Sequence, residues 1–397
     1  MNSSNTGILT INSGSSSIKF AFYRSDKQLT KHLYGKVDRI GLAGTVLTFT
    51  DLIQNQQGSL PIQASDHRSA AHILIDWIDA RIGFASVKAV GHRVVHGMNY
   101  TKPERITQEL LDELHRISPY DPDHLPREIE LIEAFRQHHP NLFQLACFDT
   151  AFHRSMPRLA RILPIPRRFE ALGVQRYGFH GLSYSYLIGE LAHIAGEQSA
   201  RERVILAHLG NGASLAAIYK GESIDTSMGF TPTGGIPMGT RPGDLDPGAA
   251  WFMMRAEKMT PQQFNHLINH ESGLLGISET SSDMRDLLEH EIVDERAAEA
   301  VALFCYQVKK WIGAFAAALN GLDTLVFSGG IGENSPIVRD RICDGLEFLG
   351  IALDEKSNMA HASLISTETS RVQVRVIPTD EEWMIASLVC RVLSIKS

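Results

Sequence analysis

The chain has 397 residues, of which 43% are hydrophobic and 21% charged, and its formal net charge is −7. The composition is ordinary for a globular protein, and the length exceeds what one hydrophobic core usually fills, so two domains are expected. The negative charge argues against nucleic acid or an anionic membrane as a partner, although it does not exclude local basic pockets that bind small anions.

The cysteines and the first residues predict a cytoplasmic protein. Cys147, Cys305, Cys343 and Cys390 lie far apart and lack the paired spacing of a metal site, which favours free thiols in a reducing compartment. The first residues lack the basic and apolar regions of a secretory signal. The chain has no apolar run of about 18 residues that could span a membrane.

A β-hairpin is predicted near the start of the chain. Residues 7–11 and 18–23 are rich in β-branched and aromatic side chains, and the polar turn 12–17 separates them. Backbone N–H groups and hydroxyls in this turn, followed by Lys19, suit phosphate oxygens. The spacing is not that of a Walker A loop, and an ordinary hairpin turn is an equally good interpretation.

Two glycine-punctuated segments each contain an arginine, Arg93 within residues 90–97 and Arg241 within residues 238–244. A guanidinium binds a phosphoryl group or a small carboxylate through two parallel hydrogen bonds. Beside phosphate-binding loops, such cations are what phosphoryl transfer requires, because the transferring group spreads negative charge over its oxygens. The pattern therefore predicts a kinase whose acceptor is itself an anion.

A second predicted hairpin, residues 204–209 and 215–219 around a glycine-containing turn, matches the pattern of the first and indicates internal duplication, with a domain boundary near residue 150. A helix is predicted over 294–319, with a left-handed cap at Asn320-Gly321. The buried strand that follows, 324–327, leads into a glycine-rich loop at 328–334, where α/β sheets usually place ligands. A plain connecting loop explains that segment equally well.

Taken together, these segments resemble the acetate kinase family of short-chain carboxylate kinases. The match covers nearly the whole chain in the right order: residues 11–20, 91–97, 148–153, 176–181, 208–214, 225–232, 238–241, 281–285, 329–335 and 379–382. No single segment is decisive, but the ordered set is highly specific.

The resemblance implies an α/β fold with two domains of the actin, hexokinase and heat-shock ATPase type, in which duplicated mixed sheets are flanked by helices. The N-terminal domain would comprise residues 1–150, joined by a C-terminal helix at 382–397, and residues 151–381 would form the nucleotide-binding and dimerisation domain. It also implies a homodimer that phosphorylates acetate with ATP and Mg²⁺ or Mn²⁺, giving ADP and acetyl phosphate. Propionate or another short-chain carboxylate is the alternative substrate.

The resemblance further assigns roles to individual residues. The catalytic residues would be Arg93, Asp149, His180 and Arg241, and the substrate would contact Arg93, Val95, Phe179 and Pro232. The nucleotide and its phosphates would contact Ser15, Ser17, Lys19, His208, Leu209, Gly210, Asn211, Gly212, Asp283, Met284, Arg285, Gly330, Ile331, Gly332, Glu333 and Asn334. The metal ion would bind at Asn12 and Glu381, close to Asp149.

The chain departs from the family pattern at a few positions. Tyr120 and Asp121 stand where the family usually carries leucine and an active-site histidine, and Leu182 and Tyr184 replace the usual threonine and histidine. Met98 stands where a second glycine is common. These departures imply an altered acyl pocket, which Tyr120 would narrow toward acetate or smaller acids.

Two other functions compete with a carboxylate kinase. A hydroxyl kinase of the same fold would use Asp149 as its general base, and a nucleotide-gated binding protein would use ATP to close on a partner. A carboxylate with a pKa of about 4 is already ionised at neutral pH and needs no base, so repulsion between two anions is the obstacle. The paired arginines address that repulsion and favour the carboxylate kinase.

Overall fold

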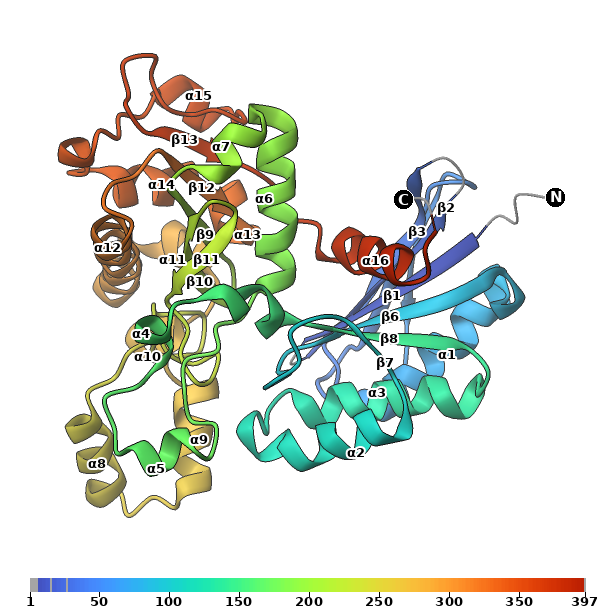
Figure 1. The fold of residues 1–397 in the computed structure, drawn as a ribbon. Helices are drawn as coiled ribbons and strands as arrows, with labels where there is room; N and C mark the ends of the chain where they lie inside the picture. Colours follow the sequence, from blue (N-terminus) through green and yellow to red (C-terminus); the bar gives the residue numbers. More distant parts are fainter. Residues whose placement is uncertain (1–5, 15, 26–27, 396–397) are drawn as a thin grey trace. The chain divides into compact units, whose positions relative to one another are not determined.

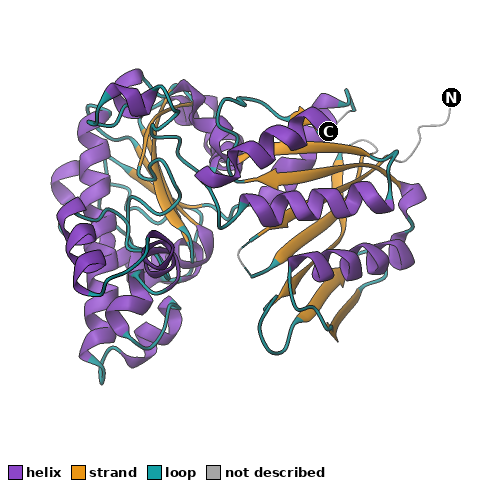
Figure 2. Ribbon diagram, turned by 90° about the horizontal axis from the view of Figure 1, so that it is seen from below, coloured by secondary structure: helices purple, strands orange, loops and turns teal. Residues whose placement is uncertain are grey.

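The computed structural model describes residues 6–14, 16–25 and 28–395 (Figure 1). Contacts divide the chain into two units, Met1–Ala151 with Asp380–Ser397 and Phe152–Thr379. Each unit has its own sheet and its own hydrophobic core. Figure 2 shows the strands of each unit accompanied by helices. Among the described residues, no helix combines the length and the apolar content that crossing a bilayer requires.

The first unit contains an eight-stranded mixed sheet with the order β5-β4-β3-β2-β1-β6-β8-β7. Its strands are β1 (Thr6–Ser13), β2 (Ile18–Ser25), β3 (Leu29–Asp38), β4 (Val46–Asp51), β5 (Gln56–Pro61), β6 (Val87–Val94), β7 (Glu104–Arg105) and β8 (Phe143–Phe148). Its helices are α1 (His67–Ile82), α2 (Gln108–Ile117), α3 (Leu125–His138) and α16 (Glu381–Val392).

Helices cover both faces of this sheet (Figure 1). On one face, Phe20, Phe22 and other buried residues of the sheet pack against apolar side chains of α1 and α3. On the other face, α16 packs on β1 and β6, over Gly91. A Cβ atom at Gly91 would lie 2.4 Å from Ile385 Cγ2, so a larger residue in β6 would push α16 off the sheet.

The second unit contains a five-stranded mixed sheet with the order β11-β10-β9-β12-β13. Its strands are β9 (Val204–Leu209), β10 (Ala213–Tyr219), β11 (Glu222–Thr226), β12 (Thr324–Ser328) and β13 (Gln373–Val376). Its helices are α4 (Arg158–Arg161), α5 (Arg167–Glu170), α6 (Gly181–Ala195), α7 (Glu197–Arg201), α8 (Pro247–Ala256), α9 (Pro261–His270), α10 (Gly273–Ser278), α11 (Met284–His290), α12 (Glu295–Ala318), α13 (Gly329–Asn334), α14 (Pro336–Cys343) and α15 (Glu355–Met359). Buried side chains of α6 pack on this sheet, and α12 contacts β9 and β10.

The predicted duplication is confirmed by the strand order. In the first unit β3, β2 and β1 pair antiparallel, and β1, β6 and β8 pair parallel. In the second unit β11, β10 and β9 pair antiparallel, and β9, β12 and β13 pair parallel. The two sheets therefore share one five-strand plan, which β4, β5 and β7 extend in the first unit. This is the expected α/β fold with duplicated mixed sheets flanked by helices.

Local predictions are mostly confirmed, with two corrections. Helix α12 ends at Ala318, and Asn320 is left-handed with φ of 58°, as expected of a cap. The first hairpin turn is shorter than predicted, because Asn12 and Ser13 belong to β1 and pair with Lys19 and Ile18. The glycine-rich segment after β12 is a short helix, α13, and not a loop.

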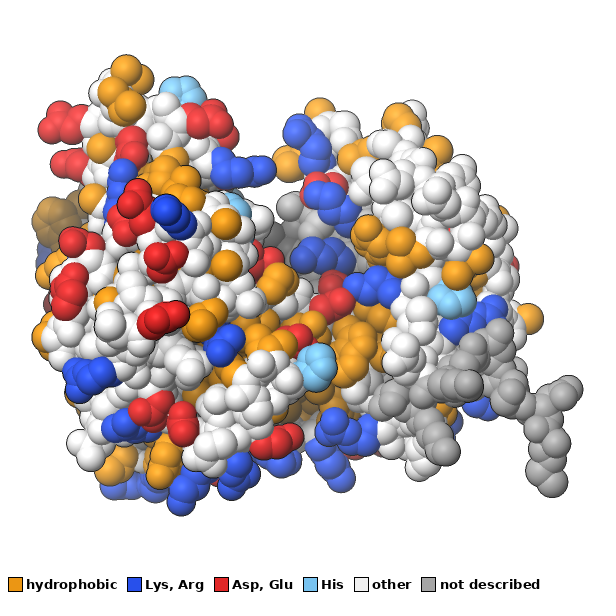
Figure 3. All heavy atoms as spheres, turned by 90° about the horizontal axis from the view of Figure 1, so that it is seen from above, with side chains coloured by type: hydrophobic (Ala, Val, Ile, Leu, Met, Phe, Trp, Pro, Cys, Tyr) orange, Lys and Arg blue, Asp and Glu red, His pale blue; other side chains and the backbone are white. Residues whose placement is uncertain are grey.

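The cysteines are free, as predicted, and charged side chains of both signs lie on the surface (Figure 3). Acidic and basic side chains are both spread over the face of the molecule drawn in Figure 3. All four cysteines are free and buried, and burial raises the pKa of the Cys305 thiol to about 11. Such thiols are protonated at neutral pH and unreactive.

Candidate active site

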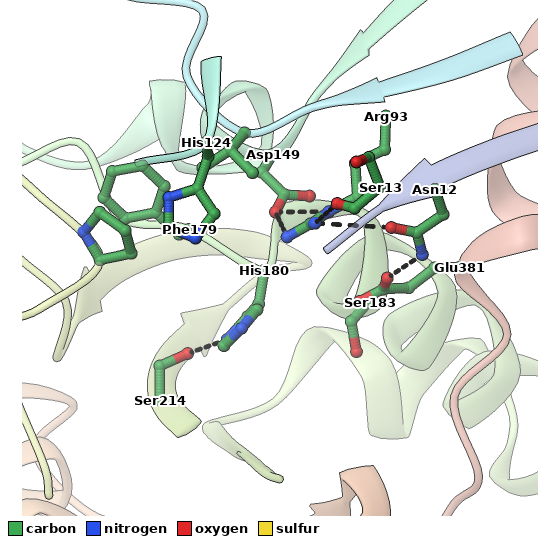
Figure 4. Close-up of polar contacts among 12 residues, drawn as sticks. Asn12, Ser13, Arg93, His124, Asp149, Phe179, His180, Ser183, Ser214 and Glu381 are labelled. Atoms are coloured by element: carbon green, nitrogen blue, oxygen red, sulfur yellow. Dashed lines mark hydrogen bonds and ion pairs between the residues drawn. The ribbon is translucent and has the colours of Figure 1, made fainter. Parts of the chain in front are cut away.

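The first cluster of candidate residues, in the first unit, is built around Arg93 and Asp149. Arg93 lies in β6 opposite Cys147 of the parallel strand β8, and Asp149 directly follows β8. The Arg93 Nε and Nη2 atoms donate hydrogen bonds of 3.0 and 2.6 Å to Asp149 Oδ2 (Figure 4). Burial alone would lower the pKa of Arg93, but the carboxylates of Asp149 and Glu381 raise it, so the guanidinium is permanently cationic.

Asn12 joins this ion pair to the beginning of α16. Its Nδ2 atom donates to Glu381 Oε2 at 2.8 Å and to Glu382 Oε1 at 3.0 Å. Arg93 Nη1 donates to Asn12 Oδ1 at 3.4 Å and to the Ser13 carbonyl at 3.2 Å (Figure 4). The carboxyl end of β1, the end of β6 and the first turn of α16 therefore meet at one place.

The oxygen-rich donors at this place fit a hard divalent cation. Burial raises the pKa of Glu382, an effect that the neighbouring Glu381 carboxylate reinforces and Lys19 opposes. Among the described residues, no group of three or more His, Cys, Asp or Glu side chains forms a ready-made metal cage. Mg²⁺ usually keeps several waters and uses only one or two carboxylates together with substrate phosphates. Asn12 and Glu381 match that kind of site.

The phosphate-binding residues predicted from the first hairpin are only partly placed by the structure. Ser15 lies outside the described residues. The Ser17 carbonyl accepts a hydrogen bond of 2.7 Å from Gly14 N, which closes the turn. Lys19 is exposed in β2 and lines a cavity of about 660 Å³ together with Glu382. Lys19 therefore shares this cavity with Glu382, a hydrogen-bond partner of Asn12.

The predicted substrate residue Val95 is held by a glutamate that sequence reasoning missed. Glu128 of α3 is fully buried, and its Oε2 accepts a hydrogen bond of 3.0 Å from Val95 N. Its Oε1 is buried and has no hydrogen-bond partner among the described residues. Burial raises the pKa of Glu128 to about 8, an effect that Arg93 opposes. The carboxyl is therefore largely protonated at neutral pH. No signal in the sequence identifies it.

Glu128 leads to a prediction about the pH dependence of stability. Since its folded-state pKa is raised above the unfolded value, its contribution to stability is complete below a pH of about 4.5 and is lost as the pH rises through about 8. Glu128→Gln keeps an oxygen that can accept from Val95 N but cannot ionise. We therefore expect the free energy of unfolding of the variant, measured by urea titration, to increase relative to that of the parent as the pH rises from 5.5 to 8.5. A constant difference across that range would contradict the assignment.

The histidines beside Arg93 are hydrogen-bonded residues of the interior. His92 is buried, and its ring shares a hydrogen bond of 2.7 Å with Gln144 Oε1. Burial lowers the pKa of His92 to about 4, so the ring is neutral. His96 is also buried, and its Nδ1 accepts from Met98 N.

The second cluster, in the second unit, is built around His180. This residue is left-handed with φ of 58° and stands directly before α6. Its Nδ1 atom is hydrogen-bonded to Ser214 Oγ at 2.8 Å (Figure 4), and Ser214 Oγ lies 2.5 Å from the hydroxyl of Tyr184. The imidazole also stacks on His208, with ring centroids 4.4 Å apart. Tyr184, noted above as a departure from the family pattern, thus helps to hold His180.

Arg241 lies beside His180 in this cluster. Its Nη1 atom donates a hydrogen bond of 2.7 Å to the Pro232 carbonyl. A Cβ atom at Gly212 would lie 2.9 Å from Arg241 Nη2 and 3.3 Å from His180 Nε2. Both side chains therefore lie directly over Gly212, and a larger residue there would displace the Arg241 guanidinium. The structure therefore brings together three predicted residues, Arg241, His180 and Gly212.

The glycine-containing segments predicted to bind the nucleotide lie together. Gly329 has φ of 75°, and a Cβ atom there would lie 2.7 Å from the Leu209 carbonyl, so α13 begins in contact with the end of β9. A Cβ atom at Gly239 would lie 2.1 Å from Asn211 Oδ1 and 3.2 Å from the Ser282 carbonyl. Three predicted nucleotide-binding segments are thus neighbours: 208–212, 329–334 and the residues next to Asp283. They include Gly210, Met284, Gly330, Ile331 and Gly332.

The side chains of several predicted residues make contacts within their own unit of the protein. Asp283 caps α11 by accepting from Arg285 N and also binds the Arg285 guanidinium at 2.6 Å. The predicted pocket residues belong to different units, Val95 to the first, Phe179 and Pro232 to the second. Tyr120 packs against the apolar cluster between α2, α3 and β8. Asp121 is hydrogen-bonded to His124 at 2.8 Å, a pair that the sequence did not indicate.

Comparisons with known proteins show the family to which the chain is similar. The family model described as the acetokinase family matches residues 7–387. Acetate kinase from Methylocella silvestris is 43% identical over 390 residues, which cover 96% of each chain. Propionate kinase from Citrobacter rodentium is 43% identical over 392 residues, covering 97% of this chain and 96% of that protein. The crystal structure of Porphyromonas gingivalis acetate kinase superimposes with a TM-score of 0.87 at 37% identity, covering 98% of this chain and all of that one.

Proposed function

Because the chain belongs to the acetokinase family, we propose that it is a kinase that transfers the terminal phosphoryl group of ATP to acetate, giving acetyl phosphate and ADP. The observation that carries the proposal is a pair of arginines whose guanidinium groups are preorganised by the protein. Arg93 is anchored on Asp149 in the first unit, and Arg241 lies over Gly212 beside His180 in the second.

The ion pair of Arg93 supports a carboxylate acceptor over a hydroxyl acceptor. A hydroxyl kinase would need Asp149 to accept a proton from its substrate. Asp149 is fully buried, and its Oδ2 accepts two hydrogen bonds from Arg93, so its carboxylate serves to orient the guanidinium. Acetate is already ionised at neutral pH, and its attack on phosphorus requires charge neutralisation and alignment. Arg93, Arg241 and His180 are the residues we assign to that task.

Asn12 and Glu381 are the residues we assign to Mg²⁺ or Mn²⁺, close to Asp149. When bound, the ion would neutralise charge on the phosphates of ATP. Ser15, Ser17 and Lys19 would contact the phosphates. The segments 208–212, 283–285 and 330–334 would hold the rest of the nucleotide. Val95, Phe179 and Pro232 would contact the methyl group of acetate.

The acid that the enzyme prefers is tested by trapping the product with hydroxylamine, which converts an acyl phosphate into a hydroxamate. We expect ATP-dependent hydroxamate formation with acetate, and a higher kcat/KM for acetate than for formate, propionate or butyrate. One methylene group in an apolar pocket changes kcat/KM by about 10- to 200-fold. A preference for propionate would change the proposed substrate but not the proposed reaction. The acetate kinase and the propionate kinase named above are equally similar to this chain. Release of ADP without hydroxamate from any acid would contradict the reaction itself.

We also propose that the protein is a cytoplasmic homodimer whose domains are the two units. The buried free thiols suit a reducing compartment. Exposed aromatic side chains on α8, Trp251 and Phe252, are 62% and 70% accessible. Adjacent large apolar side chains at a surface mark a site of association, which supports the second unit as the dimerisation domain.

A further inference from the structure

Glu333 was predicted to contact the nucleotide, but its carboxylate makes hydrogen bonds within the protein. Its Oε1 accepts from Gly329 N at 2.8 Å and from Thr379 N at 3.1 Å, and it lies 3.4 Å from Ser328 Oγ. One oxygen atom therefore joins the start of α13 to a residue that is distant in sequence. Hydrogen bonds to an ionised carboxylate are stronger than those between neutral groups.

The backbone of Glu333 is fixed as firmly as its carboxylate. Arg339 is fully buried, and its Nη1 donates to the carbonyls of Gly332 and Glu333 at 2.8 and 3.0 Å. The rest of its guanidinium donates to Asn358 in α15. Burial lowers the pKa of Arg339 to about 10, which leaves it cationic at neutral pH. Glu333 is therefore held both at its backbone carbonyl and at its carboxylate.

Thr379, the other partner, occupies a special place in the chain. It is the last residue of the second unit before the chain passes into the first unit at Asp380. Asp380 caps α16 by accepting from Trp383 N at 2.8 Å, and Glu381 is the first residue of that helix. The Thr379 hydroxyl is also hydrogen-bonded to Ser183, which in turn bonds His208. Thr379 thus connects residues assigned to the nucleotide with the residue assigned to the metal.

We propose that Glu333 is a positioning residue that ties the glycine segment of α13 to Thr379, and through two peptide bonds to Glu381. Nucleotide contacts at 330–334 then order the crossing segment that carries the metal-binding carboxylate. The inference rests on the proposed roles of α13 and Glu381. It adds that these roles are coupled by the Glu333 carboxylate, which is hydrogen-bonded within the protein.

The test measures whether ADP orders the crossing segment, using hydrogen–deuterium exchange of the full-length enzyme without metal at saturating ADP. In the parent protein, ADP should protect peptides covering 329–334 and also those covering 377–384. In Glu333→Ala, the protection of 377–384 should be lost, and ADP should bind about tenfold more weakly by calorimetry, as expected for losing hydrogen bonds to a charged acceptor. Glu333→Gln retains an oxygen acceptor and should restore the protection.

Asp340→Ala is the matched control, because Asp340 is an exposed carboxylate of the following helix α14 and lies outside the segments assigned to the nucleotide. At saturating ADP this variant should keep the protection of 377–384. If Glu333→Ala does not fold, Thr379→Pro removes the N–H donor and should abolish the same protection. Protection of 377–384 that survives in Glu333→Ala or in Thr379→Pro would overturn the inference. Failure of the parent protein to bind ADP would instead overturn the proposed function and, with it, the inference.

Discussion

Replacing Arg241 with alanine should lower kcat for acyl phosphate formation by a factor of about 10³ or more, the scale on which arginine fingers act in phosphoryl transfer. The Arg241 guanidinium is held by the Pro232 carbonyl and lies over Gly212 next to His180, so its charge is already in position before substrates bind. Preorganised charge of this kind acts mainly on the transition state. The loss should therefore fall on kcat more than on the KM for either substrate.

Two matched variants make this result specific. Arg241→Lys keeps a positive charge but not the planar fork of donors, and should recover only part of the lost rate. Arg116 lies on the surface of α2 and is 62% exposed, so Arg116→Ala should have the kcat of the parent. A turnover of Arg241→Ala within tenfold of the parent would remove Arg241 from the proposed role.

Arg93 and Asp149 should behave as one unit in a double-mutant cycle. Arg93→Ala leaves a fully buried carboxylate without its cation, which should cost about 3–5 kcal/mol of stability and most of the activity. Asp149→Asn should lower kcat by about 10², because the guanidinium loses the anchor that orients it. The double variant should be more stable than Arg93→Ala and no less active, since both changes remove the same interaction.

The cycle separates orientation from general-base catalysis. If Asp149 acted as a base for a hydroxyl acceptor, the effects of the two substitutions on kcat would multiply, and the rate would follow the ionisation of Asp149. Measuring kcat/KM for the four proteins, and their unfolding in urea, decides between these roles. Multiplying effects in the cycle would contradict the assignment of Asp149 as an anchor for Arg93.

Much of the fold could be predicted because local sequence and global topology agree. The two hairpins combine β-branched strands with polar turns, and these signals are local. The short helix α13 was missed because glycine has a low helix propensity. Part of what holds it is remote in sequence: the Glu333 carboxylate also accepts from Thr379 N, and Arg339, which donates to its last carbonyls, is itself held by Asn358. Tertiary contacts of this kind leave no local pattern.

The candidate site shows the same division between local and remote information. Arg93, His180 and Arg241 could be identified because glycines surround them and because the ordered set of segments resembles one family. Ser214 and Tyr184, which hold His180, and Glu128, which binds Val95 N, could not be predicted, since each acts through a hydrogen bond between residues far apart in the sequence. The family resemblance assigned Glu333 to the nucleotide, whereas its carboxylate accepts a hydrogen bond from Thr379 N.

The measurement that tests the central claim most directly is the ratio of hydroxamate formed to ADP released when the enzyme is given ATP, a magnesium salt, acetate and hydroxylamine. Direct transfer to a carboxylate predicts one hydroxamate for each ADP and almost no ADP when acetate is left out. Steady ADP release that does not depend on acetate, with inorganic phosphate in place of hydroxamate, would contradict it.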